Sequence, residues 1–156
     1  MAHMARSFQV DNPRSRDVES LINAHLEFAR SATPLCHVFA LSAEKLDRND
    51  IVLYSCRDDD QLLAIGALRK IADDHFEIKS MHTARGARGQ GIGHQLLQYL
   101  IDAAKTRGAR QISLETGTSA GFESARSLYQ KSGFEVCAPF GDYSSSPDNV
   151  CMTLFV

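Results

Sequence analysis

Four glycines fall within the nine residues Arg85–Gly93, directly ahead of an amphipathic segment, Ile92–Arg107. Glycine adopts left-handed backbone freely and lets other groups approach the chain closely, so this segment predicts a tight turn. The segment that follows repeats apolar residues at helical spacing, and Gly108 stands where a helix commonly ends. The apolar stripe consists of Ile92, Leu96, Leu97, Leu100, Ile101 and Ala104. The chain must therefore place a glycine-rich turn at the start of a helix that packs on a core.

The residues before this turn predict two helices and a run of strands. Asp17–Arg30 has helical spacing after Ser15, a suitable N-cap, and Ser42 precedes a second short helix. Apolar runs bounded by polar turns are typical of strands. They lie at Ser7–Val10, Ile51–Cys56, Leu62–Ile71 and His75–Met81. In the last of these, Phe76 and Ile78 alternate with Glu77, Lys79 and Met81.

The residues after the long helix continue the alternation of strands and helices. Gln111–Glu115 predicts a strand, Gly121–Ser132 predicts a helix closed by Gly133, and two further strands complete the chain. This order predicts an α/β chain of the α+β type. We expect a mixed, mostly antiparallel central sheet of about six to seven strands, flanked by about four helices.

Size, composition and charge exclude several classes of protein. A chain of 156 residues with 44% hydrophobic and 23% charged residues fits one folded domain, and Met1–Met4 resemble a cloning remnant. A net charge of -2 gives no general basic field, so nucleic acid is not an expected partner. The sequence has no apolar run of bilayer length, so we expect a cytoplasmic protein with no membrane partner.

The four cysteines are scattered, with no C-x-x-C pair and no histidine at zinc-finger spacing. Cys56 and Cys151 lie within apolar runs that predict strands, which favours packing over reactivity. We therefore expect reduced, mostly buried thiols and no metal site. The other two thiols are Cys36 and Cys137.

Three phosphate-binding patterns have glycines in a turn of this kind. A P-loop needs Lys and then Ser or Thr after its last glycine, but Ile92 and Gly93 follow Gly91. A dinucleotide fingerprint needs a third glycine where His94 or Leu96 stands, and only about 40 residues remain after the ribose-binding position that Glu115 imitates. The P-loop pattern therefore fails, and the dinucleotide pattern is disfavoured.

The third pattern, R-x-x-G-x-G, is met by Arg88, Gly91 and Gly93. Its glycines let a pyrophosphate approach the backbone, and the start of the helix presents unpaired N–H groups and the positive end of the dipole. Arg85 and Arg88 add positive charge. Alternatively, the segment is only a tight strand-to-helix turn with solvated arginines.

A second block, Ala125–Phe134, reads A-x-x-L-Y-x-K-x-G-F and begins about 36 residues after the turn. With the turn, it resembles the GNAT superfamily of N-acetyltransferases, over roughly Ser7–Val156. The stretch Leu114–Gly117 and the tail from Phe140 also resemble a bacterial subgroup of that superfamily. The resemblance implies a GNAT-like fold, with residues 5–156 as a single acyl-CoA N-acyltransferase domain and acetyl-CoA as cosubstrate.

The resemblance assigns a set of residues to the cofactor. The backbone at Met81, His82 and Thr83 would align the pantetheine arm, and an N–H near Met81 would meet the thioester oxygen. Tyr129 would lie near the sulfur and protonate the departing thiolate, although a half-buried structural tyrosine is the alternative. Phe122 stands where family members often carry an asparagine that contacts the cofactor, so it can pack instead. The pyrophosphate would lie against Arg88, Gly89, Gln90, Gly91, Ile92 and Gly93.

Removing the proton from an amine acceptor calls for a base, and two carboxylates on neighbouring predicted strands are available. They are Glu77, the first candidate, and Glu115; either could instead be a salt-bridge partner, Glu77 with Lys79 for example. Burial at such positions raises the pKa of a carboxyl group toward the working pH. His82 is a weaker alternative, since it can simply be solvated.

The long loop before the last strand is predicted to bind the acceptor through Phe140, Asp142 and Tyr143. Packing of the two aromatic rings on the sheet, and a turn shaped by Asp142, are the alternatives.

The expected function is transfer of an acetyl group from acetyl-CoA to a primary amine, directly in a ternary complex. The expected acceptor is a small metabolite or an amino-acid-like amine. Protein or peptide N-acetylation and coenzyme A binding without turnover remain as alternatives, and a homodimer is compatible with either.

Overall fold

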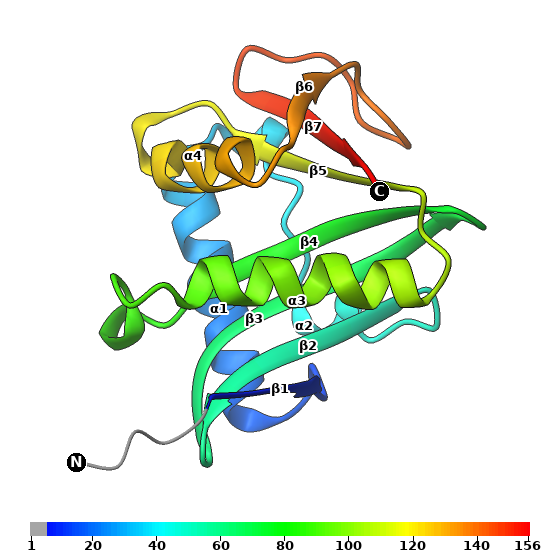
Figure 1. Cartoon of the computed structure of the whole chain (residues 1–156). Helices are drawn as coiled ribbons and strands as arrows, with labels where there is room; N and C mark the ends of the chain where they lie inside the picture. Colours follow the sequence, from blue (N-terminus) through cyan, green and yellow to red (C-terminus); the bar gives the residue numbers. More distant parts are fainter. Residues whose placement is uncertain (1–5) are drawn as a thin grey trace.

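A seven-stranded sheet forms the centre of the computed structural model of the protein, which describes residues 6–156 (Figure 1). Its order is β1-β2-β3-β4-β5-β7-β6, with β4 and β5 parallel and the other neighbouring pairs antiparallel. The predicted mixed, mostly antiparallel sheet is confirmed. The expected cloning remnant, Met1–Met4, lies outside the described residues. The strands are β1 (Arg6–Val10), β2 (Ile51–Asp58), β3 (Gln61–Ala72), β4 (His75–Thr83), β5 (Gln111–Gly117), β6 (Glu135–Cys137) and β7 (Asn149–Phe155).

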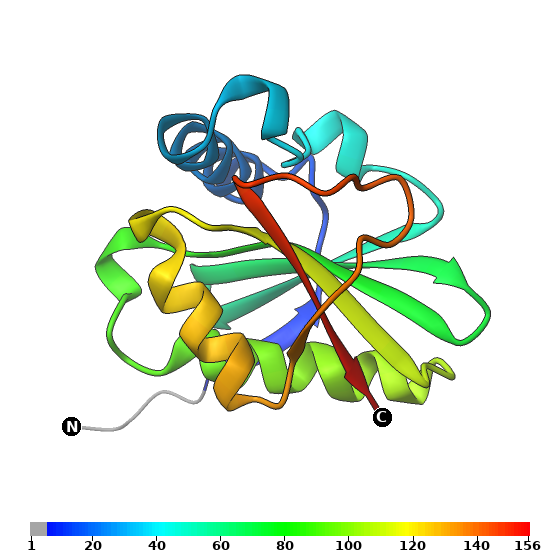
Figure 2. The same ribbon diagram turned by 90° about the horizontal axis from the view of Figure 1, so that it is seen from above.

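Helices cover both faces of the sheet. Figure 2 shows α1 and α2 on one face and α3 and α4 on the other. Among the helices of residues 6–156, none has the combination of length and hydropathy that crossing a bilayer requires. The helices are α1 (Arg16–Ala32), α2 (Ala43–Leu46), α3 (Ile92–Thr106) and α4 (Glu123–Lys131), with short 3-10 turns η1 (Leu35–His37), η2 (Arg85–Ala87) and η3 (Ala120–Phe122).

The sheet separates two hydrophobic clusters. The larger lies on the α3 face, where Leu97 and Leu100 are fully buried with Phe76 and Ile112 of the sheet. All six residues of the predicted apolar stripe of α3 are buried, so that prediction is confirmed. The smaller cluster joins Ile22 of α1 to β2 and β3. Each fully buried leucine or isoleucine side chain contributes about 2 kcal/mol to the free energy of unfolding. The buried side chains of α3 therefore hold this helix against one face of the sheet.

Helix ends follow the sequence signals with one exception. Gly108 and Gly133 have φ of +99° and +100° after α3 and α4, as the helix-ending role of glycine predicts. The Ser42 side chain caps α2 by accepting a hydrogen bond from the Lys45 N–H. Ser15 occupies the N-cap of α1, but its side chain makes no capping hydrogen bond.

The thiols are less uniformly buried than expected. Cys56 and Cys151 are buried in β2 and β7, as predicted. Cys137 is only partly buried in β6, and Cys36 is exposed in η1. The prediction that most of the thiols are buried therefore holds for Cys56 and Cys151 and is wrong for Cys36.

A bulge in β4 overturns the predicted alternation near the glycine-rich turn. Ser80 has φ of +57°, and the pairing of β4 with β3 shifts register between Ile65 and Ala67. The extra residue reverses which face later side chains occupy. Met81 therefore packs against the α3 cluster instead of sharing a face with Glu77.

The parallel pair β4 and β5 separates before either strand ends. Pairing stops at Ile78 and Leu114, although β4 continues to Thr83 and β5 to Gly117. Backbone groups beyond that point have no partner across the gap. The two strands thus form a wedge that opens toward the glycine-rich turn.

Candidate active site

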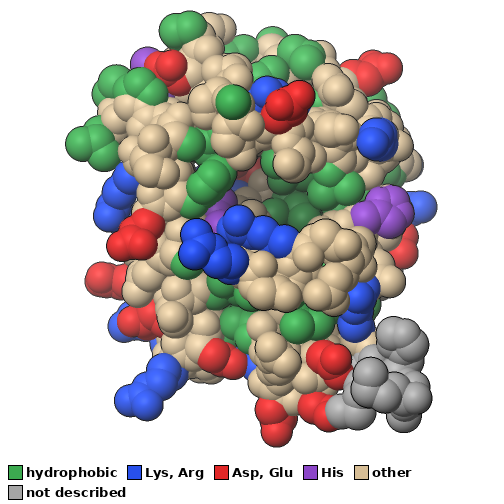
Figure 3. Space-filling view, turned by 90° about the vertical axis from the view of Figure 1, so that its left-hand side faces the viewer, with side chains coloured by type: hydrophobic (Ala, Val, Ile, Leu, Met, Phe, Trp, Pro, Cys, Tyr) green, Lys and Arg blue, Asp and Glu red, His purple; other side chains and the backbone are tan. Residues whose placement is uncertain are grey.

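A cavity of about 560 Å³ occupies the wedge between β4 and β5. Figure 3 shows the molecule hollowed on this side, with hydrophobic side chains inside the hollow and Lys or Arg side chains at its edge. The lining comes from α1, the segment after it, β4, the glycine-rich turn, the start of α3, β5 and α4. The cavity therefore reaches from one face of the sheet to the other.

The glycine-rich turn forms one end of the cavity. Gly89 and Gly91 both have φ of +76°, and a Cβ added at either would meet nothing within 4 Å. The N-cap residue of α3 is Gly91, which has no side chain to cap the helix, so within the described residues the first amides of α3 are available to another acceptor. The exposed Arg88 lies beside them. Open backbone, free amides and a guanidinium fit a pyrophosphate, as predicted from the spacing.

Tyr129 lies where α4 meets the wedge. Its side chain is 8% exposed, and its hydroxyl lies 3.9 Å from Sδ of Met81. Burial, with a smaller effect of the nearby Glu115, raises the pKa of Tyr129 to about 12. The phenol is therefore protonated at physiological pH and can donate its proton.

On the α1 face, Glu77 belongs to a buried network. Lys79 Nζ lies 3.2 Å from Oε2 of Glu77 and donates to the Tyr143 hydroxyl at 2.7 Å. The Tyr143 hydroxyl in turn donates to Oε2 of Glu77. Burial, and then the negative charge of Glu77, raise the pKa of Tyr143. The charge of Glu77 is thus balanced within the protein, as the salt-bridge alternative predicted.

Glu115 has a different environment, one strand away. Oε2 of Glu115 accepts a hydrogen bond from Nδ2 of Asn149, and no cation lies within salt-bridge distance of it among the described residues. Burial raises the pKa of Glu115, although the Asn149 hydrogen bond and the more distant Lys79 oppose the change. Glu115 therefore has the properties of a base more clearly than Glu77 does.

Two imidazoles meet on the α1 side of the cavity. Nδ1 of His25 and Nδ1 of His82 lie 3.1 Å apart, so one ring donates to the other. Burial lowers the pKa of His25 to about 3 and that of His82 to about 4, and neighbouring positive charge adds to both changes. Both rings are therefore neutral at physiological pH.

The segment after α1 is joined to the loop before β7. The rings of Phe39 and Tyr143 meet edge to face at 5.2 Å. Nδ1 of His37 lies 2.5 Å from Oδ2 of Asp148, and Nδ2 of Asn149 donates to the His37 carbonyl at 3.1 Å. These contacts link the two segments beside the cavity, which Phe39, Tyr143 and Asn149 line.

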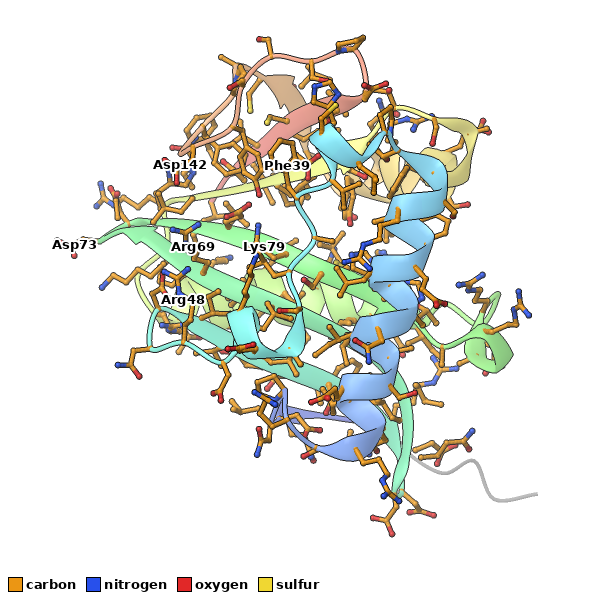
Figure 4. The ribbon with its side chains drawn as sticks, turned by 180° about the vertical axis from the view of Figure 1, so that it is seen from behind. Phe39, Arg48, Arg69, Asp73, Lys79 and Asp142 are labelled. Atoms are coloured by element: carbon orange, nitrogen blue, oxygen red, sulfur yellow. The ribbon has the colours of Figure 1, made fainter. Side chains whose placement is uncertain are left out.

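Most predicted site residues meet at this cavity, and three do not. Gln90 is exposed on the turn, Asp142 is exposed on its loop, and Phe140 packs against His75 and Tyr143. Figure 4 shows Asp142 near the end of the sheet, away from Lys79. The lining includes Glu77, Met81, His82, Thr83, Arg88, Gly89, Gly91, Ile92, Gly93, Glu115, Tyr129 and Tyr143.

Sequence reasoning missed the residues that α1 and β7 bring to the cavity. His25 and Phe28 line it from α1, and Asn149 lines it from the start of β7. A signal existed for α1, since Leu21, His25 and Phe28 form a second stripe at helical spacing beside the buried one. Asn149 had no such signal.

Phe122 packs, as the alternative to a cofactor contact predicted. Its ring meets Phe28 at 4.9 Å between centroids. A Cβ on Gly117 would lie 2.2 Å from the Phe122 ring, so only glycine fits at that position. The contact closes the wall of the cavity between β5 and α1.

Comparison with known proteins agrees with this geometry. Residues 18–134 match the acetyltransferase (GNAT) family. The chain is 41% identical over 145 residues to the uncharacterized N-acetyltransferase YsnE of Bacillus subtilis, covering 93% of this chain and 96% of that protein. It is 35% identical over 137 residues to the uncharacterized N-acetyltransferase YedL of Escherichia coli, covering 88% of this chain and 86% of that protein.

A solved structure confirms the fold. A GNAT family acetyltransferase from Elizabethkingia anophelis, with acetyl-CoA bound, superposes with a TM-score of 0.72 at 20% identity. The superposition covers 97% of this chain and 98% of that one. The chain therefore belongs to the acetyltransferase (GNAT) family and is an N-acetyltransferase that uses acetyl-CoA.

Proposed function

We propose that this N-acetyltransferase moves the acetyl group of acetyl-CoA directly to the primary amine of a small molecule. The observation that carries the proposal is the wedge, which joins the glycine-rich turn at the start of α3 to a chamber with two carboxylates. Tyr129 and Met81 approach it from the α3 face, and Glu77 and Glu115 from the α1 face. Donor and acceptor can thus meet between the strands without a covalent intermediate on the protein.

The first requirement is a neutral amine. An alkylamine with a pKa near 10 is only about 0.1% neutral at pH 7, so a base that removes its proton increases the reactive fraction. We assign this role to Glu115 in place of Glu77, because Glu77 is held by Lys79 and Tyr143. Glu115 has only an amide donor, and its raised pKa favours taking up a proton.

The second requirement is a proton for the leaving group. As the new N–C bond forms, the C–S bond breaks and its electron pair stays on sulfur, where the protonated Tyr129 can neutralise it. The nitrogen loses a second proton as the amide forms, and solvent carries this proton back to the phenolate of Tyr129, which restores the phenol. Backbone N–H groups beyond the bulge at Ser80 have no strand partner across the wedge and are suited to stabilise the thioester oxygen.

A small acceptor is favoured over a protein or peptide by the contacts that close the acceptor side. Phe39 packs on Tyr143, and His37 binds Asp148. An extended peptide would need an open groove between these two segments. A small amine only has to enter the chamber.

The test is release of free thiol from acetyl-CoA in the presence of an amine panel. We expect amine-dependent thiol release together with an N-acetylated product identified by mass spectrometry. Acetyl-CoA binding with no turnover on any amine or peptide would contradict the proposal and favour a coenzyme A binding module. Turnover restricted to peptides would contradict the small acceptor.

The pH dependence separates the two carboxylates. In Glu115→Gln the base is lost, so we expect kcat/KM to fall by about 100-fold near pH 7 and to recover toward pH 10, where bulk solvent supplies neutral amine. Wild-type activity should decline as pH falls through the raised pKa of Glu115, because the protonated group cannot accept a proton.

The matched control is Glu77→Gln, which removes an ion-pair partner of Lys79 without removing the proposed base. For this variant we expect kcat/KM to fall by the same factor at every pH. The opposite pattern, with pH-dependent loss only in Glu77→Gln, would show that the base is Glu77.

A further inference from the structure

We propose that the acceptor is an arylalkylamine, a monoamine with an aromatic group and no carboxylate. The proposal rests on the proposed function and names the acceptor class of that site. Its evidence is the balance of charge in the chamber and the nature of its walls.

The chamber has one acidic group whose charge is not balanced. Glu77 is compensated by Lys79 at 3.2 Å, whereas the Asn149 amide is the one side-chain partner of Glu115 within residues 6–156. Oδ1 of the same Asn149 is buried and has no hydrogen-bond partner in the part of the chain that the structure describes. A carboxylate and a free carbonyl oxygen from neighbouring strands together suit a single ammonium group, which brings one positive charge and several donors.

The chamber has no cation available for an acceptor carboxylate. Among the described residues that line the cavity, the permanently charged cations are Lys79 and Arg88. Lys79 is occupied by Glu77 and Tyr143 and its side chain is 8% exposed, while Arg88 lies at the turn that we assign to pyrophosphate. His25 and His82 are neutral.

The remaining imidazole and two nearby arginines are also engaged. His37 pairs with Asp148. Arg48 and Arg69, labelled in Figure 4, lie toward the β3–β4 hairpin, outside the cavity lining, and both bind Asp50, at 2.9 Å and 3.3 Å. An α-amino acid would therefore bring a carboxylate into a chamber that offers it no partner, which is strongly unfavourable.

The walls are suited to an aromatic ring. Phe28 and Phe122 form an edge-to-face pair on one side, and Phe39 and Tyr143 form another. Both pairs line the cavity, and the neutral His82 lies 6.2 Å from Phe28 between ring centroids. A planar apolar group between such faces is favoured over a flexible polar chain, because aromatic contacts add to burial of apolar area.

The test compares acceptors that differ in one group. Phenethylamine, phenylalanine and phenylalanine amide share the ring and the amine, and only phenylalanine has a carboxylate. After correction for the fraction of neutral amine, we expect kcat/KM for phenethylamine to exceed that for phenylalanine by at least about 100-fold. For phenylalanine amide we expect kcat/KM within about tenfold of the value for phenethylamine, because the amide has no carboxylate charge.

Two further amines test the walls and the single charge. Butylamine lacks the ring, and 1,4-diaminobutane adds a second cation. We expect kcat/KM for each of them to be about tenfold or more below that for phenethylamine. In Phe28→Leu and in Phe39→Leu, the ratio of phenethylamine to butylamine turnover should decrease. This ratio does not depend on the fraction of folded enzyme, so partial unfolding cannot imitate the result.

Equal or faster turnover of phenylalanine would overturn the inference, as would a preference for the diamine. Turnover of peptides alone would overturn it too, while N-acetyl transfer itself would stand. Absence of thiol release with every amine and peptide would reject the proposed function as well, so the two failures are distinguishable.

Discussion

Gly91→Glu is expected to weaken acetyl-CoA binding by about 100-fold or more. Gly91 has φ of +76°, a conformation that a non-glycine residue leaves when it can, so binding must force the turn of the variant back into it at a cost of about 1–2 kcal/mol. The new carboxylate would also stand at the uncapped start of α3, where repulsion of a pyrophosphate is worth about 1–3 kcal/mol. The combined loss of about 3 kcal/mol corresponds to about two factors of ten in the dissociation constant.

Titration calorimetry measures this affinity, and the matched control is Gly86→Glu. Gly86 lies in the same turn and is exposed, it does not line the cavity, and a Cβ there meets nothing within 4 Å. That variant carries the same added charge and should bind acetyl-CoA nearly as wild type does. Gly91→Ala brings the backbone strain without the added charge, so its effect on the dissociation constant measures the contribution of strain alone. If Gly91→Glu retained wild-type affinity, the turn would not be the pyrophosphate site.

Tyr129→Phe is expected to lower kcat by at least about tenfold while the dissociation constant of acetyl-CoA stays nearly unchanged. The variant keeps the buried ring and removes only the hydroxyl, which lies 3.9 Å from the Met81 sulfur. Since the pKa of Tyr129 is raised to about 12, the phenol stays protonated across the working range. The wild-type rate should therefore show no titration of this group below about pH 11.

Steady-state and single-turnover kinetics test this role. Tyr99→Phe is the control, because Tyr99 stacks on Phe8 at 5.1 Å and is not part of the cavity lining. That substitution should leave kcat within about twofold of wild type. If Tyr129→Phe had unchanged kcat with the chemical step limiting, Tyr129 would serve packing alone.

Features written in consecutive residues could be predicted from the sequence. The stripe of α3, the glycine-rich turn and the helix ends at Gly108 and Gly133 depend on spacing within about one helical segment, and the structure confirms each of them. The resemblance carried by Arg88–Gly93 and Ala125–Phe134 is of the same kind. Local spacing is sufficient there because the physical cause, a periodic apolar face or a left-handed backbone, is itself local.

The acceptor side depended on contacts between distant segments. The bulge at Ser80 places Met81 on the opposite face of the sheet, and no residue type in the sequence predicts that bulge. Glu77 and Glu115 looked alike as strand carboxylates until Lys79, Tyr143 and Asn149 distinguished them.

The same reason explains the misplaced and missed residues. Phe140 and Asp142 lie in a long loop whose path the sequence does not determine, and the structure places them outside the cavity lining. His25 and Phe28 reach it because α1 packs on the sheet opposite α3. The residues by themselves determined the helices, the strands and the glycine-rich turn. The charge of the chamber was decided only by the tertiary structure, which brings Tyr143 to Glu77 and Asn149 to Glu115. Electrostatic partners are set by distance in space and not by distance along the chain.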